Sequence, residues 1–243
     1  KSTARTISGN SISKPANKGI FIFTKSKTGT ISDNTITSGK DKGIAINSVK
    51  CKMTISGNTI KKCKAYPIYC NPASTSYAIT LKKNIITGNS KKIDGIRADS
   101  GKLILSSNTI SSCSRAIILS SKVKGTVYPN TFKKNTYNNV KVNSSYVNTL
   151  TVKSLSGKSK SAKTATLNWK KLSSASGYVV YRSASKNGSY TKISTIKKNK
   201  TITYKDSKLK RKSTYYYKIV PYTTIGKTTV YGLDSKIVSI KIK

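Results

Sequence analysis

An Asn that recurs at nearly constant intervals through the first 145 residues constrains the fold more than any other feature. The segments ISGNSI, ISDNTI, ISGNTI, LKKNII, LSSNTI and FKKNTY place it at Asn10, Asn34, Asn58, Asn84, Asn108 and Asn135. The spacing is 24 residues three times, 26 once and 27 once. An apolar residue lies three positions before each Asn, and another lies two positions after it. A period of this length is the signature of a repeat architecture.

A second apolar segment follows in each of the first five repeats, at 19–22, 43–46, 67–70, 95–98 and 116–119. Apolar residues alternate within these segments, as in strands, and turn-forming Asn, Gly, Ser and Lys connect them. A coil of three short strands is a parallel β-helix, whose equivalent residues stack about 4.8 Å apart. The coils resemble the right-handed parallel β-helix repeats of the pectate-lyase-like superfamily. We therefore expect an all-β fold with about six such coils over residues 1–145.

The Asn column has a physical explanation in such a fold. Asn tolerates the left-handed backbone that a sharp corner needs, and its amide can bond the Asn residues above and below. We therefore expect the six Asn residues to form a ladder at one corner. Asp33, next to Asn34, is interpreted as a turn residue of the same corner.

Four cysteines lie in this segment, at positions 51, 63, 70 and 113. Cys63 and Cys113 are equivalent but two coils apart, about 9.6 Å, which exceeds the Cα separation that a disulfide spans. Cys70 shares a column with Ile22 and Ile46 and should point inward. Free buried thiols are therefore favoured over a disulfide framework, although spacing alone does not fix connectivity.

Residues 146–243 lack the Asn period and indicate a second, antiparallel β-domain. Alternating strands are expected at 164–169, 177–182, 190–193, 201–204, 215–220 and 237–242. Leu-x-Trp ending at Trp169, Gly-Tyr-x-Val-Tyr, and Leu209 six residues before Tyr215 resemble a fibronectin type III module. The resemblance implies a β-sandwich with Trp169 in its core and Leu209 and Tyr215 in a tyrosine corner. It implies no ligand, and Arg-Gly-Asp is absent.

Composition excludes several chemistries. The chain has 47 Lys and Arg, six Asp, and no Glu, Gln or His, so its formal net charge is +41. Triads that need His, His-bearing zinc sites and Glu pairs are therefore impossible. Asp41 and Asp94 are too far apart along the coils to share a calcium ion. We expect no metal and no cofactor.

Arg97 and Asp99 form the best remaining catalytic candidate. Many β-helices of the resembled superfamily are polysaccharide lyases or hydrolases, and these two residues point outward from one strand. A surface ion pair is the simpler interpretation, and we lean toward no catalysis in this segment. A lyase or hydrolase whose catalytic coils lie upstream remains an alternative.

The positive charge is uniform, with 25 cations against four Asp in residues 1–145 and 22 against two in residues 146–243. Such a field attracts anionic polymers or glycans of a cell wall or host, and nucleic acid only non-specifically. Codon bias and habitat would produce the same composition without a binding role. Outward lysines that could bind such polymers include Lys61, Lys62, Lys82, Lys83, Lys133 and Lys134.

We expect a non-catalytic segment of a bacterial surface or secreted protein, a β-helix stalk with a fibronectin type III spacer or cap. No export signal or membrane-spanning run is visible, so we expect the export signal elsewhere and no membrane insertion. A purely structural segment that self-associates into filaments is a further alternative.

Overall fold

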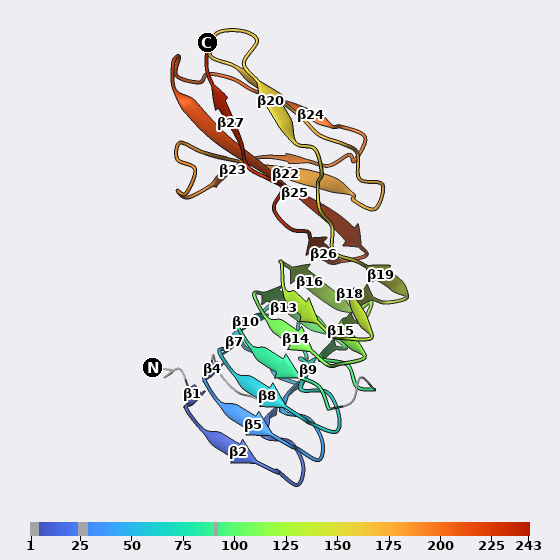
Figure 1. Ribbon diagram of the computed structural model, residues 1–243. Helices are drawn as coiled ribbons and strands as arrows, with labels where there is room; N and C mark the ends of the chain where they lie inside the picture. The colour runs from blue at the N-terminus through green and yellow to red at the C-terminus, as the bar shows by residue number, and fades with distance from the viewer. Residues whose placement is uncertain (1–4, 24–28, 90–91) are drawn as a thin grey trace. The chain divides into compact units, whose positions relative to one another are not determined.

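The computed structural model describes residues 5–23, 29–89 and 92–243 (Figure 1). These ranges contain strands β1 to β27 and no helix, which confirms the all-β prediction. They accordingly offer no helix long and apolar enough to cross a membrane. The chain forms two compact units: unit 1 comprises Lys1–Asn148 with Ile225–Val230, and unit 2 comprises Thr149–Thr224 with Tyr231–Lys243.

Unit 1 is a parallel β-helix of six rungs, joined by about five turns, whose strands form three sheets. Sheet A contains β1 (Arg5–Ser8), β4 (Gly29–Ser32), β7 (Met53–Ser56), β10 (Ala78–Lys82), β13 (Gly101–Ser106) and β16 (Val123–Val127). Sheet B contains β2 (Ser11–Ser13), β5 (Thr35–Thr37), β8 (Thr59–Lys61), β11 (Ile85–Thr87), β14 (Thr109–Ser111) and β17 (Thr131–Lys133). Sheet C contains β3 (Ile20–Phe23), β6 (Ile44–Asn47), β9 (Ile68–Asn71), β12 (Ile96–Ala98), β15 (Arg115–Leu119) and β18 (Tyr137–Val142).

Two further strands pair within unit 1. Strand β19 (Ser145–Val147) runs antiparallel to β18 in sheet C. Strand β26 (Thr228–Tyr231) pairs in parallel with β16, through Thr126 with Thr229 and Val127 with Val230.

The core of unit 1 is built from columns of identical or similar side chains. In sheet A, Ile31, Ile55 and Leu81 occupy successive rungs and are at most 1% exposed. Sheet B repeats this with Ile36, Ile60, Ile86 and Ile110, and each of these is fully buried. Removing one such side chain from water contributes about 1.5–3 kcal/mol, so the repeated apolar positions are what hold the coils together.

The Asn ladder runs through this core, and four of its members are completely buried: Asn34, Asn58, Asn84 and Asn108. Asn34 donates to Asn58 Oδ1 from its Nδ2 (2.9 Å) and from its backbone N (3.1 Å). Asn58 likewise donates from its Nδ2 and from its backbone N to Asn84 Oδ1. The backbone N–H groups at this corner have no strand partner, and the Asn side-chain oxygens accept their hydrogen bonds instead.

The sixth rung differs from the sequence prediction. Asn108 bonds Asn130 rather than Asn135, with Nδ2 to Oδ1 at 2.9 Å, and Phe132 pairs with Ile110. Only three residues, 120–122, join β15 to β16, so this coil is 22 residues long. The prediction that placed Asn135 in the column is therefore wrong. Its amide lies at a different corner, where Oδ1 accepts from Cys113 N (2.9 Å).

The backbone of the corner also differs from expectation. The residue before the ladder Asn, not the Asn itself, adopts the left-handed conformation: φ is 68° at Gly9, 56° at Asp33, 67° at Gly57, 56° at Lys83 and 56° at Ser107. Asp33 is therefore a turn residue, as predicted. The Asn is free to face inward because its neighbour makes the turn.

Unit 2 is an antiparallel β-sandwich. One sheet contains β20 (Ser156–Lys158), β21 (Ala165–Asn168) and β24 (Thr203–Asp206). The other contains β23 (Thr191–Ile196), β22 (Gly177–Ser183), β25 (Thr214–Ile225) and β27 (Val238–Lys241). The first strand, β20, was not predicted, because Ser-Gly-Lys carries no apolar alternation.

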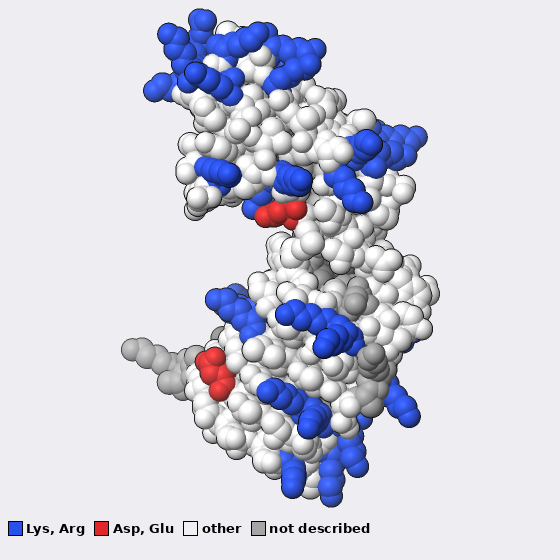
Figure 2. Space-filling model, in the orientation of Figure 1, with Lys and Arg blue, Asp and Glu red and all other residues white. Residues whose placement is uncertain are grey.

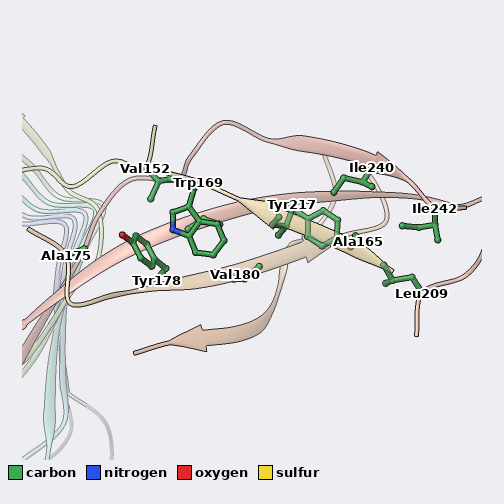
Figure 3. Packing of buried hydrophobic residues seen from close by; sticks show 12 residues of the cluster. Val152, Ala165, Trp169, Ala175, Tyr178, Val180, Leu209, Tyr217, Ile240 and Ile242 are labelled. Atoms are coloured by element: carbon green, nitrogen blue, oxygen red, sulfur yellow. The ribbon is translucent and has the colours of Figure 1, made fainter. Parts of the chain in front are cut away.

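The core of unit 2 lies between its two sheets (Figure 3). Trp169 is 3% exposed and packs edge-on against Tyr178, with ring centroids 5.3 Å apart. The Tyr178 hydroxyl is satisfied by the backbone N of Leu172 (2.9 Å), which donates to it. Leu209 is buried, and the Tyr215 hydroxyl accepts from the backbone N of Lys210 (3.3 Å).

Candidate functional site

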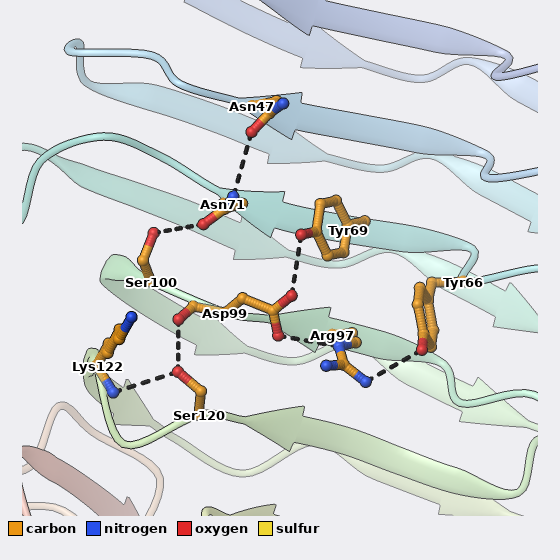
Figure 4. Close-up of polar contacts among 9 residues, drawn as sticks. All are labelled: Asn47, Tyr66, Tyr69, Asn71, Arg97, Asp99, Ser100, Ser120 and Lys122. Atoms are coloured by element: carbon orange, nitrogen blue, oxygen red, sulfur yellow. Dashed lines mark hydrogen bonds and ion pairs between the residues drawn. The ribbon is translucent and has the colours of Figure 1, made fainter.

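The pair that the sequence singled out, Arg97 and Asp99, lies on the outer face of sheet C (Figure 4). Ile96 and Ala98 point into the core and are fully buried, so period-two alternation turns Arg97 outward, and Asp99 follows at the strand end. The Arg97 Nε donates to Asp99 Oδ1 at 2.9 Å. The structure thus contains the surface ion pair that the sequence suggested.

Two tyrosines from neighbouring segments complete this cluster. The Tyr69 hydroxyl donates to Asp99 Oδ2 (2.9 Å), and Arg97 Nη1 donates to the Tyr66 hydroxyl (3.1 Å). Both oxygens of the Asp99 carboxylate therefore accept a hydrogen bond. Sequence reasoning missed both tyrosines, although a signal was present: Tyr69 and Arg97 occupy the same column of sheet C.

The electrostatics of the cluster oppose proton transfer at neutral pH. Burial, together with the bond it donates to Asp99, raises the pKa of Tyr69 to about 12. Partial burial lowers the pKa of Arg97, but the hydrogen bond and charge of Asp99 outweigh this, so the pKa lies above its usual value. A general acid or base works best with a pKa near the operating pH, so neither Tyr69 nor Arg97 suits that role.

A row of small polar residues continues beside this cluster (Figure 4). Asn71 Nδ2 donates to Asn47 Oδ1 (3.3 Å), and the Ser100 hydroxyl lies 2.8 Å from Asn71 Oδ1. Ser120 bonds the backbone oxygen of Asp99. The outer face of sheet C therefore presents amide, hydroxyl, carboxylate and guanidinium groups along adjacent rungs.

The six lysines proposed for binding occupy two corners of unit 1 and do not converge. Lys82 and Lys83 lie between sheets A and B, whereas Lys61, Lys62, Lys133 and Lys134 lie between sheets B and C. All six are exposed. In the column of Lys61 and Lys133 the two intervening rungs carry Thr87 and Ser111, which separates the like charges. Figure 2 shows Lys and Arg side chains standing out from the visible face of both units, with few acidic ones.

The two carboxylates considered for calcium have separate partners. Asp41 contacts Lys18 and Lys42, each with a nitrogen-to-oxygen distance of 3.2 Å. Burial raises the pKa of Asp41, but the bonds and charges of Lys42 and Lys18 outweigh it, so the pKa lies below its usual value. Asp94 Oδ1 accepts from the backbone N of Arg115 (3.1 Å). Within residues 5–23, 29–89 and 92–243, no three His, Cys, Asp or Glu side chains group as metal ligands would.

Comparison with known proteins identifies the family. Residues 1–190 match the family model described as "Periplasmic copper-binding protein (NosD)". The chain belongs to the NosD family. This family is one of right-handed, pectate-lyase-like β-helices, in agreement with the fold of unit 1. A search of curated protein sequences finds no match.

Solved structures overlap with part of the chain. A Fn3-like protein from Clostridium thermocellum is 29% identical, with 37% of this chain and 88% of that chain covered and a TM-score of 0.33. The chicken CNTN1 FN1–FN3 domains are 17% identical, with 43% and 35% covered and a TM-score of 0.35. A β-1,2-glucanase from Parabacteroides distasonis is 17% identical, with 39% and 12% covered and a TM-score of 0.31.

The donor set of this chain does not fit the copper in the NosD family description. Copper sites use His, Cys and Met, and this sequence has no His, one Met and four Cys. Met53 and all four cysteines are buried, and the cysteines are free thiols. Burial raises the pKa values of Cys70 and Cys113 to about 12, which opposes the thiolate that a metal would bind.

Proposed function

We propose that this chain is a non-catalytic segment that acts outside the cytoplasm and binds anionic polymers or glycans of a cell envelope or host. The observation that carries the proposal is a formal net charge of +41 over the whole chain, in which the β-helix segment, residues 1–145, sets 25 cations and four Asp around core columns that are apolar. Because the interior accommodates no lysine, the cations face solvent and create a field that attracts polyanions.

The separation of Lys61, Lys82 and Lys133 from like-charged neighbours in their columns supports binding by a diffuse field. Thr87 and Ser111 separate Lys61 from Lys133, and Ser56 and Ser106 flank Lys82 on its two sides. Separated exposed cations form no fixed pocket, so they would hold a flexible polyanion through many weak contacts. Such binding is strongly salt-dependent, because each contact releases counterions.

We propose that unit 2 is a fibronectin type III spacer. The Tyr215 contact to Lys210, the buried Leu209 and the Trp169 core support this assignment. Its seven strands in two antiparallel sheets are the arrangement of that module. Copper binding, named in the family's description, is not part of the proposal, because the donors do not fit it.

An array of glycans and wall polymers, probed with the whole chain at low and at high ionic strength, tests the proposal. We expect the chain to bind anionic polymers at low salt, with an affinity that depends little on the identity of the sugar. We expect this binding to be lost at high salt. Binding to neutral glycans that survives high salt, with no signal on anionic polymers, would contradict the proposal.

A further inference from the structure

The loop that joins β22 to β23 carries Asn187 followed by Gly188, the one Asn-Gly pair in the sequence (Figure 1). Both residues are exposed, and the loop lies outside the buried cluster of unit 2. Asn is a chemically labile residue, and a following glycine hinders its side-chain amide least, because glycine has no Cβ. This loop therefore places a reactive pair of groups in water.

The backbone nitrogen of Gly188 is held weakly. It donates to Ser185 O at 3.3 Å, which closes a four-residue turn but is longer than a usual N–H···O bond. Within the described residues, the Asn187 side chain has no hydrogen-bond partner. The loop is anchored beside this point, where the Tyr190 hydroxyl donates to Lys186 O (3.0 Å). A weak bond therefore opposes the approach of the Gly188 nitrogen to the Asn187 side chain.

We propose that Asn187 is a site of spontaneous deamidation, which converts it to aspartate and isoaspartate without an enzyme. The Gly188 backbone nitrogen gives up its proton to hydroxide and attacks Asn187 Cγ, so that an N–Cγ bond forms while the Cγ–Nδ2 bond breaks. Nδ2 takes a proton from water and leaves as ammonia, and a cyclic succinimide remains. Water then opens the ring at Cγ, which gives aspartate, or at the backbone carbonyl carbon, which gives isoaspartate.

Either product changes the charge of the loop. A neutral amide becomes a carboxylate, so the formal net charge of +41 falls by one for each modified chain. Isoaspartate also lengthens the backbone by one methylene group. Because Asn187 lies in an exposed loop outside the core, we expect both products to remain folded.

The one Asp-Gly pair, Asp94 followed by Gly95, has the same chemistry but is locked by the β-helix. Gly95 is buried, and its nitrogen donates to Arg115 O at 2.9 Å. Asp94 Oδ1 accepts from Arg115 N (3.1 Å), so the nitrogen and the carboxyl group are both bound to one residue. A Cβ at Gly95 would lie 2.5 Å from Ile110 Cγ2, so the backbone has little room to turn. We therefore expect no succinimide at Asp94 in the folded chain.

Peptide mapping by mass spectrometry tests the proposal. The folded chain is incubated at pH 8 and at pH 5, and it is then digested with pepsin at acidic pH, where succinimide formation is slow. We expect Asn187 to be replaced by aspartate and isoaspartate at pH 8, and far more slowly at pH 5, because the attacking nitrogen must lose its proton. Asn187 that stays intact at pH 8, or that yields aspartate without isoaspartate, would overturn the proposal.

Gly188→Ala is the matched variant. Gly188 does not have a positive φ, so alanine suits its backbone, and the added Cβ would lie 3.1 Å from Ser185 Cβ in an exposed loop. We expect this variant to slow the reaction about tenfold or more, which corresponds to about 1.4 kcal/mol of activation free energy. An unchanged rate would overturn the attack by the Gly188 nitrogen.

Two other positions in the same maps separate local sequence from fold. Asn143 is exposed in a turn but precedes Ser144, and we expect it to react more slowly than Asn187. In the denatured chain Asp94 should form isoaspartate, whereas in the folded chain it should not. Equal rates at Asn143 and Asn187, or equal rates at Asp94 in the folded and denatured chain, would overturn the inference.

Discussion

At the scale of single residues, the buried Asn ladder shows how a polar side chain becomes indispensable inside an apolar core. Asn58 Oδ1 accepts from both nitrogens of Asn34, while Asn58 Nδ2 donates to Asn84 Oδ1 and to the backbone oxygen of Ile31 (2.9 Å each). A buried donor or acceptor left without its partner costs about 1–3 kcal/mol. One Asn therefore supports the rungs on both sides of it.

Replacing Asn58 by Leu should destabilise unit 1. The substitution removes the acceptor of the Asn34 backbone N and the side-chain donor to Asn84 Oδ1 and to the backbone oxygen of Ile31, and Asn84 Oδ1 keeps only the backbone N of residue 58. We expect a loss of about 3 kcal/mol or more. Denaturant unfolding followed by far-UV circular dichroism measures it. Asn17→Leu, at an exposed position, is the matched control and should change little. Equal midpoints for Asn58→Leu and the wild type would count against the ladder.

The thiols should be inert in the folded chain. Cys63, Cys70 and Cys113 are fully buried, and burial raises the pKa of Cys70 from 9.0 to about 12. Because the folded state holds the proton more tightly, the native fold should lose stability as pH rises from about 9 to about 12. At pH 8, a thiol reagent should label these three thiols only as fast as the protein unfolds. Rapid labelling without denaturant would contradict this.

At the scale of structural elements, the corners between sheets A and B depend on a left-handed residue before each Asn. Gly9 and Gly57 have nearly the same φ, 68° and 67°, but different surroundings. A Cβ at Gly57 would lie 2.1 Å from Asp33 Oδ1, whereas at Gly9 nothing lies within 4 Å. Comparing alanine substitutions at these two positions therefore separates the cost of the left-handed backbone from the cost of the steric conflict.

Gly57→Ala should therefore cost more than Gly9→Ala. Left-handed backbone costs a residue with a Cβ about 1–2 kcal/mol, and Gly57→Ala adds the conflict with Asp33. Thermal or denaturant unfolding of both variants gives the difference. Adding Asp33→Ala to Gly57→Ala should return the loss to the level of Gly9→Ala. Equal losses in the two single variants would refute the steric contribution.

The sequence predicted the elements well where side chains repeat and less well where coil length changes. Alternation identified the columns of Ile31 and Ile36, because each rung buries the same positions. The sixth coil was misaligned because FKKNTY resembles earlier corners, while the shorter link at 120–122 moves the true corner to Asn130. Strand β20 is held by pairing with β21 and leaves no apolar pattern in the sequence.

The candidate site was predicted only in part for a related reason. Arg97 and Asp99 are two residues apart, so alternation alone places them together. Tyr66 and Tyr69 reach the same face through the stacking of rungs, and their contacts with Asp99 and Arg97 appear only when each rung is aligned with the next. The contacts of Lys18 and Lys42 with Asp41 depend on side-chain geometry that no spacing encodes.

At the scale of the whole molecule, the positive surface and the apolar core both follow from the alternation of inward and outward residues along the strands. The buried side chains are mostly apolar or amide and include no Lys or Arg of the described residues, so the described cations face solvent in a chain with 47 cations against six acids. Self-repulsion of such a surface is relieved when anions gather around it. We therefore expect the chain to bind flexible anionic polymers over much of its surface.

The affinity of the whole chain for polygalacturonate, measured across a series of salt concentrations, tests this account most directly. The account predicts that the logarithm of the binding constant falls steeply and linearly with the logarithm of salt concentration, because many lysine contacts release counterions. A binding constant that stays level across the series would contradict it, since the lysine field would then contribute nothing to recognition.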